Sequence, residues 1–194
     1  MIKLVFKSRI PLQTPIAVKL LLSSILITLL VGWSLKSEAS SQKSLQGEDS
    51  IVNKTKLKNS YSNRELTQIA KRTYQQVNQY RASLGLEPLK FNNAIAKQAK
   101  IHSRNMAQQS VEFSHRGFQK RVEAIAKTIP YRSAAENVAY NMGHNNPVNT
   151  AVTGWIKSDG HRKNIEGDYN LTGVGVAVNP AGEYYFTQIF ILEN

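Results

Sequence analysis

The chain of 194 residues contains no cysteine. Disulfide frameworks, thiolate nucleophiles and zinc sites built on thiolates are therefore excluded. A lipoprotein anchored through a cysteine that follows its leader is excluded for the same reason. Two compact hydrolase motifs are also missing: the chain has no His-Glu-x-x-His and no Gly-x-Ser-x-Gly. Any hydrolytic site must therefore be assembled from residues that lie far apart in the sequence.

Acidic residues are scarce. There are 13 of them against 25 lysines and arginines, which gives a formal net charge of +12. Residues 1–39 carry five of the basic and one of the acidic side chains, so the remainder of the chain keeps a net charge of +8. Such a charge favours anionic partners, namely cell-wall polymers, lipid headgroups or nucleic acid. The composition, 41% hydrophobic and 20% charged, is ordinary for a globular domain.

The N-terminal residues 1–39 have the layout of a secretory leader. A basic region with Lys3, Lys7, Arg9 and Lys19 precedes an uncharged apolar run over residues 20–33, and Ser37-Glu38-Ala39 then places small residues at positions 37 and 39. This order is typical of a signal peptide. If the apolar run is extended to residue 35, an uncleaved membrane anchor is the alternative. We therefore expect a protein that is secreted or held at the cell envelope, and export makes nucleic acid an unexpected partner.

Residues 40–62 are rich in Ser, Asn, Gln and Lys and contain only isolated apolar side chains. They predict a flexible basic linker, because such a segment cannot bury enough surface to offset the entropy of ordering. Lys54, Lys56 and Lys58 give this linker an affinity for anionic surfaces. The folded domain is then predicted to cover residues 63–194.

Within that domain, hydrophobic periodicity predicts four helices followed by a hairpin. The helices are expected from Asn63 to a stop at Gly85, after a cap at Asn92 or Asn93, over residues 118–129, and from Pro147 through Trp155. Alternating β-branched and aromatic residues predict strands over residues 171–178 and 184–192, joined by a turn. Helices with a terminal antiparallel hairpin indicate an α+β fold in which helices pack on a small sheet.

Three distant segments each place a titratable residue among small or apolar neighbours. The first is Phe113-Ser114-His115, the second is residues 134–139 with Glu136, and the third is Trp155 through Ile165, where a break at Gly160 would present His161 on a turn. If they converge, two imidazoles and a carboxylate suit zinc and its bound water. Without metal the same residues would form a hydrogen-bonded network. Spacing alone does not decide between the two. His102 lies on the inner stripe of its helix and is expected to be a structural histidine.

In this order the segments resemble the CAP superfamily of cysteine-rich secretory proteins, antigen five and pathogenesis-related proteins, in particular its secreted bacterial branch. The matching pieces are residues 78–81 with Leu89, 102–107, 113–115, 135–139, 155–165, 173–177 and 185–190. The resemblance implies an α-β-α sandwich with a central antiparallel sheet flanked by helices. It also implies a cleft lined by two histidines and two acidic residues, which binds zinc or another divalent cation in some members.

Carried over by motif position, His115, Glu136 and His161 match three of the four cleft residues. Ser158 stands where the fourth, acidic residue is expected, and Asp159 is a candidate replacement. Arg162 is a further candidate neighbour of the cleft, where it would grip an anion beside His161. A site with one carboxylate fewer should hold a metal more weakly.

The sequence therefore supports three functions, in this order. The first is a non-enzymatic binding module at the cell envelope or outside the cell, with a divalent ion in the His/Glu cleft and a lipid or peptide as ligand. The second is a metal-assisted hydrolase of peptide or wall polymer that uses His115, Glu136 and His161. The third is a structural adhesion domain whose basic linker binds an anionic envelope polymer. No single activity follows from the fold itself.

Overall fold

The computed structural model describes the backbone of residues 2–11 and the whole of residues 61–194. The predicted apolar run of the leader and the linker up to residue 60 lie outside these residues. Within the described ranges, no helix is long and apolar enough to cross a membrane.

Helices and strands of the domain follow one another much as the periodicity predicts. In chain order they are β1 (Ile2–Pro11), α2 (Asn63–Ser83), β2 (Lys90–Phe91), α3 (Asn93–Ala107), α4 (Phe118–Ala126), β3 (Tyr131–Asn141), α5 (Pro147–Lys157), α6 (Asp159–Ile165), β4 (Leu171–Val178) and β5 (Tyr184–Glu193). The predicted hairpin is confirmed as β4 and β5, which pair antiparallel. The four predicted helices are α2 to α5.

Local capping explains where the helices begin. Ser62 and Glu65 form a capping box at α2, so the cap lies one residue before the predicted Asn63. Asn92 accepts hydrogen bonds from the amides of Ala94 and Ile95, which confirms it as the cap of α3. Pro147 occupies the first turn of α5, as predicted.

The region around His161 differs from the prediction. Residues 155–165 break at Ser158, not at Gly160, and His161 lies inside the short helix α6 instead of on a turn. Ser158 ends α5 in an extended conformation and also precedes α6. Gly160 is therefore a helical residue, which is tolerated because one glycine in a short helix costs only about 1 kcal/mol.

The strands form one sheet with the order β1-β3-β5-β4-β2. All neighbours are antiparallel except β2, which runs parallel to β4 over two residue pairs. At the other edge, β1 pairs with β3, from Ile2 opposite Asn141 to Pro11 opposite Ser133. Residues 2–11 thus belong to the sheet, although the sequence predicts them as the basic region of a leader. Removal of that leader stays a prediction.

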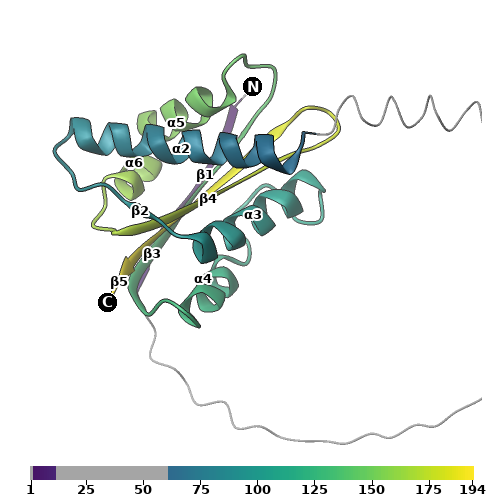
Figure 1. Cartoon of the computed structure of the whole chain (residues 1–194). Coiled ribbons are helices and arrows are strands. Elements are labelled where there is room, and N and C mark those ends of the chain that lie inside the picture. The colour runs from purple at the N-terminus through teal and green to yellow at the C-terminus, as the bar shows by residue number, and fades with distance from the viewer. Residues whose placement is uncertain (1, 12–60) are drawn as a thin grey trace, which may run out of the picture. The chain divides into compact units, whose positions relative to one another are not determined.

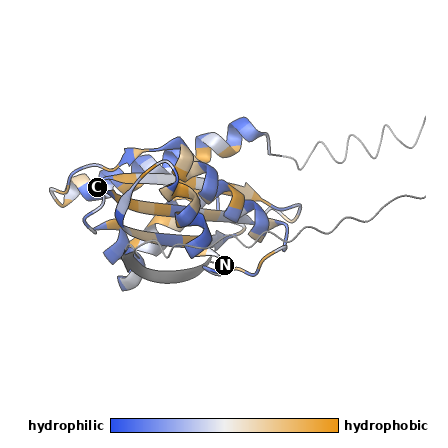
Figure 2. Cartoon of the chain, turned by 90° about the horizontal axis from the view of Figure 1, so that it is seen from below, coloured by the Kyte–Doolittle hydropathy of each residue, from blue (hydrophilic) through white to orange (hydrophobic). Residues whose placement is uncertain are grey.

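Helices cover both faces of the sheet, which confirms the α-β-α sandwich (Figure 1). One core cluster joins α2, α5 and α6 to one face and includes Trp155, Phe186 and Phe190. Another cluster joins α3 and α4 to the opposite face through Ile95, Phe118 and Ile189. In Figure 2, hydrophobic residues lie mainly along the strands and hydrophilic residues mainly on the outer sides of the helices.

Helix α3 lies directly on the backbone of β4. A Cβ atom added to Gly173 would stand 2.2 Å from the amide nitrogen of Ala96, and one added to Gly175 would stand 2.1 Å from that of Lys100. Both contacts are with helix backbone, which cannot rotate away. The two glycines are therefore required by the close approach of helix and strand.

This contact predicts the effect of adding one methyl group. Gly175→Ala should lower the free energy of unfolding by about 1–3 kcal/mol, because α3 must move away from β4. Chemical denaturation measures the loss, and amide chemical shifts of residues 99–101 should report the displaced helix. As a control, Gly182→Ala adds a methyl group to open space at a positive φ of 80°. It should lose only the backbone penalty of about 1–2 kcal/mol and leave the shifts of α3 unchanged. Unchanged α3 shifts in Gly175→Ala would contradict the contact.

Candidate functional site

Glu136 is the centre of a buried charge cluster between β3 and α4. Its side chain is fully buried, and both of its carboxylate oxygens are bound. The guanidinium of Arg121 donates from Nε to Oε2 at 2.8 Å and from Nη2 to Oε1 at 2.7 Å. His115 Nδ1 lies 2.8 Å from Oε1. Because a carboxylate can only accept, His115 donates this hydrogen bond and its tautomer is fixed.

The surroundings of Glu136 keep its carboxyl group ionised. Burial alone would raise the pKa of Glu136, but the hydrogen bond from His115 and the positive charge of Arg121 outweigh burial and hold that pKa below its ordinary value. The pKa of His102, which lies nearby, is lowered by burial and by the charge of Arg121. His102 is therefore neutral near pH 7. It donates from Nε2 to the carbonyl oxygen of Ser114 at 2.8 Å, as expected for a structural histidine.

Arg121 is the site residue that sequence reasoning missed. It is buried on the inner stripe of α4 together with Phe118, Val122 and Ile125, and its Nη1 also donates to the carbonyl of Arg116. A charged residue on an otherwise apolar helix face is a detectable signal, because a buried guanidinium requires a partner of opposite charge. The periodicity of α4 alone does not say which carboxylate that partner is.

The structure brings His115 to Glu136, whereas the described contacts of His161 are with Asn137 and Ser158. Successive residues of a strand point to opposite faces of the sheet. Glu136 points towards α4, whereas Asn137 points towards α6 and donates to the carbonyl of His161 at 3.0 Å. Asn164, also on α6, donates to the side chain of Asn137 at 2.9 Å. The carboxylate of Glu136 and the side chain of Asn137 therefore lie on opposite faces of the sheet.

The other predicted cleft neighbours gather around His161. Ser158 Oγ lies 2.7 Å from His161 Nδ1. Asp159 is exposed and forms a surface ion pair with Arg162 at 2.8 Å. In none of their described contacts do these three residues reach His115 or Glu136.

This arrangement does not fit the predicted divalent cation. Both oxygens of Glu136 are bound by Arg121, and a second cation beside the guanidinium would be repelled. Over the described residues, no group of three or more His, Asp or Glu is positioned to hold a metal ion. His115 Nε2 is buried without a hydrogen-bond partner, but one nitrogen is too few for a site.

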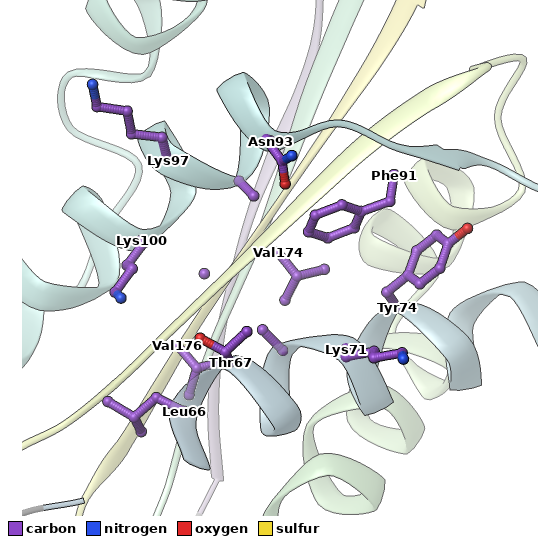
Figure 3. Close-up of a pocket in the computed structure, with 13 residues that line it drawn as sticks. Leu66, Thr67, Lys71, Tyr74, Phe91, Asn93, Lys97, Lys100, Val174 and Val176 are labelled. Carbon is purple, nitrogen blue, oxygen red and sulfur yellow. The ribbon is translucent and has the colours of Figure 1, made fainter. Parts of the chain in front are cut away.

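A second candidate site is a groove between α2 and α3. Its cavity of about 480 Å³ has the size of an ordinary ligand pocket, roughly 300–1,000 Å³. In Figure 3, β4 runs between the two helices, with Val174 and Val176 in the groove, Lys97 and Lys100 on the α3 side and Lys71 on the α2 side. The remaining lining is mainly apolar: Leu66, Thr67, Ala70, Tyr74, Phe91, Asn93, Ala96 and Gly175.

The chain is similar to known proteins in both sequence and structure. Residues 74–190 match the profile of the cysteine-rich secretory protein family, CAP. The chain belongs to this family. The resemblance of its motifs to the CAP superfamily is therefore confirmed, and residues 61–194 are called the CAP domain below.

Two relatives come from Bacillus subtilis. The uncharacterised membrane protein YlbC is 34% identical over 120 residues, which cover 59% of this chain and 32% of the relative. The uncharacterised protein YkwD is 32% identical over 124 residues, which cover 62% of this chain and 46% of the relative. The match thus spans less than half the length of either relative.

Solved structures of bacterial proteins share the fold. A cysteine-rich secretory protein of Staphylococcus aureus is 26% identical with a TM-score of 0.55, over 69% of this chain and 41% of its own. An extracellular protein of Bacillus anthracis that contains an SCP domain is 27% identical with a TM-score of 0.51, over 69% and 44%. An outer surface protein of Borrelia burgdorferi, 17% identical with a TM-score of 0.56 over 66% and 94%, shows the same fold.

The buried cluster of the CAP domain predicts how the unfolding free energy depends on the charge of Arg121 and on pH. Arg121→Met leaves Glu136 with an unpaired buried charge and should cost about 3–5 kcal/mol of unfolding free energy at pH 7. Since the pKa of Glu136 lies below its ordinary value in the folded chain, the ionised carboxylate stabilises the fold above about pH 4.3. That stability is lost as the pH falls through the folded-state pKa.

Denaturant titrations from pH 7 to pH 3 test this dependence. Glu136→Gln should flatten the acid side of the stability curve. The loss of unfolding free energy in Arg121→Met, relative to the parent, should be smaller at pH 5 than at pH 7, because the unpaired carboxyl group of Glu136 takes up a proton. Arg132→Met removes an exposed arginine and should change stability by less than about 0.5 kcal/mol. A parallel acid profile in the parent and in Glu136→Gln would contradict the assignment.

Zinc titration by calorimetry tests the metal hypothesis directly. Because Arg121 occupies the carboxylate, His115→Ala and His161→Ala should bind zinc as the parent chain does. The loss of about tenfold or more that removal of a ligand contact causes should not appear. One-to-one binding that both substitutions abolish would restore the predicted His/Glu metal site.

Proposed function

We propose that the CAP domain is a non-enzymatic binding module that works at the cell envelope or outside the cell, and that its ligand occupies the α2–α3 groove. The observation that carries the proposal is the groove's lining. Apolar walls from Leu66, Ala70 and Tyr74 stand beside Lys71, Lys97 and Lys100, and the lining contains no acidic residue. A ligand with an apolar body and an anionic group, either a lipid or a peptide, matches both properties.

The lysines of the groove are available to such a ligand. Over the described residues, none of the three forms an ion pair with a carboxylate. Lys100 donates only to the side-chain oxygen of Asn63, at 3.2 Å. An anionic headgroup at the rim of an apolar groove is less screened than on a flat surface, because the walls exclude water.

The buried cluster supports a binding module more than a hydrolase. A general base needs an accessible atom and a nucleophile within reach. His115 and Glu136 are buried, and Glu136 is bound by both His115 and Arg121, so these contacts tie the link before α4 to β3. The proposal therefore assigns this cluster a structural role and the groove the binding role.

The sources of the related proteins agree with a place outside the cytoplasm. One solved neighbour is described as an extracellular protein and another as an outer surface protein, whereas one sequence relative is described as a membrane protein. We propose the same setting for this chain, with residues 1–39 acting as leader or anchor. An anionic envelope polymer would then meet a domain and linker of net positive charge.

Titration with sodium dodecanoate tests the groove with an anionic amphiphile of one chain. Saturable binding should appear by calorimetry, and it should weaken by about fivefold or more in the double variant Lys97→Glu/Lys100→Glu because two attractions become repulsions. It should also weaken as ionic strength rises. Ala96→Trp, which fills the groove, should reduce it further.

A matched control reverses two exposed lysines, one on α4 and one at its C-cap, Lys120→Glu/Lys127→Glu. It keeps the same net charge as the groove variant. Equal loss in both double variants would show that only overall charge matters and would contradict the assigned groove. Binding of dodecyltrimethylammonium with the same affinity would also contradict it.

A further inference from the structure

The outer edge of β4 is open along the α2–α3 groove. Its only neighbour on that side within the described residues is β2, which pairs with Leu171 and Thr172 and then ends. The amide of Asn92 donates to the carbonyl of Thr172 at 2.9 Å, so the peptide groups of Thr172 point outward. Because peptide groups alternate with a period of two residues, those of Val174, Val176 and Val178 point the same way. On this side of β4, away from β5, none of the three has a backbone hydrogen-bond partner among the described residues.

The chain leaves this edge because α3 begins there. Asn92 caps α3 with its side chain, so the backbone turns away from β4 two residues after β2 starts. Helix α3 then crosses over Gly173 and Gly175 on one face. On the other face, Val174 and Val176 pack in the same cluster as Ile69 and Ala70 of α2. The open edge therefore lies at the bottom of a groove whose walls are helices.

Unpaired peptide groups in such a position are costly. Val174 and Val176 are 3% and 2% exposed, so water solvates their outward groups poorly, and an unpaired buried peptide group costs free energy comparable to a lost hydrogen bond. A strand that enters the groove would satisfy these groups. An acyl chain would leave them unpaired, which favours a peptide over a lipid as the ligand.

The charge beside the edge selects the kind of peptide. Lys97, Lys100 and Arg104 lie along one side of α3 at intervals of three and four residues, and α3 contains no acidic residue. Two cavities adjoin along β4, because Leu66, Lys100 and Val176 line both of them. The second cavity, of about 610 Å³, adds Arg104 and again has no acidic residue in its lining.

We propose that the CAP domain binds an extended acidic peptide segment as an added strand on the outer edge of β4, between α2 and α3. This inference rests on the proposed binding role of the groove and names its ligand. Backbone hydrogen bonds to Val174, Val176 and Val178 supply the affinity, in the manner of strand addition to an open sheet edge. Side chains of the added strand alternate between the two helices.

The alternation predicts the sequence pattern of the ligand. Apolar side chains face Leu66, Ala70 and Tyr74 on the α2 side, and acidic side chains face the cations of α3. Alternate residues of a strand lie about 6.8 Å apart, and three to four residues of a helix advance about 4.5–6 Å. Flexible lysine and arginine side chains cover the difference. Helices on both sides of the edge also keep it from pairing with another sheet, since covering an edge with a helix is one way proteins protect it.

A blocked eight-residue peptide of alternating valine and glutamate, added to the full chain, is the probe. The inference predicts saturable binding by calorimetry, weakened about fivefold or more in Lys97→Glu/Lys100→Glu and unchanged in Lys120→Glu/Lys127→Glu. A control peptide with the same composition but alternating L and D residues cannot present alternate faces as a strand, and it should bind at least about tenfold more weakly because the backbone bonds are lost.

Hydrogen exchange provides the direct readout. Bound L-peptide should slow exchange of the outward amides of Val174, Val176 and Val178, while the amides of Gly173 and Gly175, already paired with β5, should change little. Val176→Pro removes one outward donor at a position where an edge strand tolerates proline, and it should weaken binding of the L-peptide.

The outcomes separate the two proposals. Equal binding of the L and L/D peptides, or no protection of the outward amides, overturns strand addition. If dodecanoate still binds in that case, the groove remains a binding site for amphiphiles. If neither the peptides nor dodecanoate binds, the proposed function falls as well.

Discussion

The close contact between α3 and β4 sets the rest of this domain's architecture. Gly173 and Gly175 let the helix backbone rest on the strand backbone, and this position fixes where α3 must begin. Asn92 caps the helix immediately after β2, so β2 has only two residues and most of the outer edge of β4 stays open. The groove, the position of the basic residues of α3 beside it and the unpaired edge of β4 all follow from this one packing requirement.

Strand β3, which lies on the other side of β5 from β4, is subject to a different constraint, the burial of a charge. Glu136 is buried in the middle of the strand, which is stable only because Arg121 supplies a compensating charge with two hydrogen bonds. In a site of two histidines and two acids, a divalent cation would supply that charge. Here the guanidinium does so from within the chain, and Ser158 stands where the motif comparison expects the second acid.

Much of the fold could be predicted from the sequence because its signals are local. Caps at Asn92 and Pro147, the apolar stripe of α4 and the alternation in β4 depend on residues near one another in the chain. The site could be predicted only in part. Glu136 and His115 were identified by their motifs, but the face of β3 to which each side chain points depends on register, and a shift of one residue reverses it. The motifs alone therefore do not say that Asn137, and not Glu136, contacts the carbonyl of His161.

The position of the charged surface was the property that could least be predicted from local sequence. The excess of basic residues indicated anionic partners without locating them, because composition averages over the surface. The structure shows that Lys97, Lys100 and Arg104 share one helix and, with Lys71, line the two adjoining cavities. A helix that carries only cations has no i,i+4 ion pairs and no acidic first turn to favour its dipole. Arg104 in the last turn is favoured by the helix dipole. Lys97 and Lys100 gain nothing from the dipole, and an anionic ligand along β4 would account for their position.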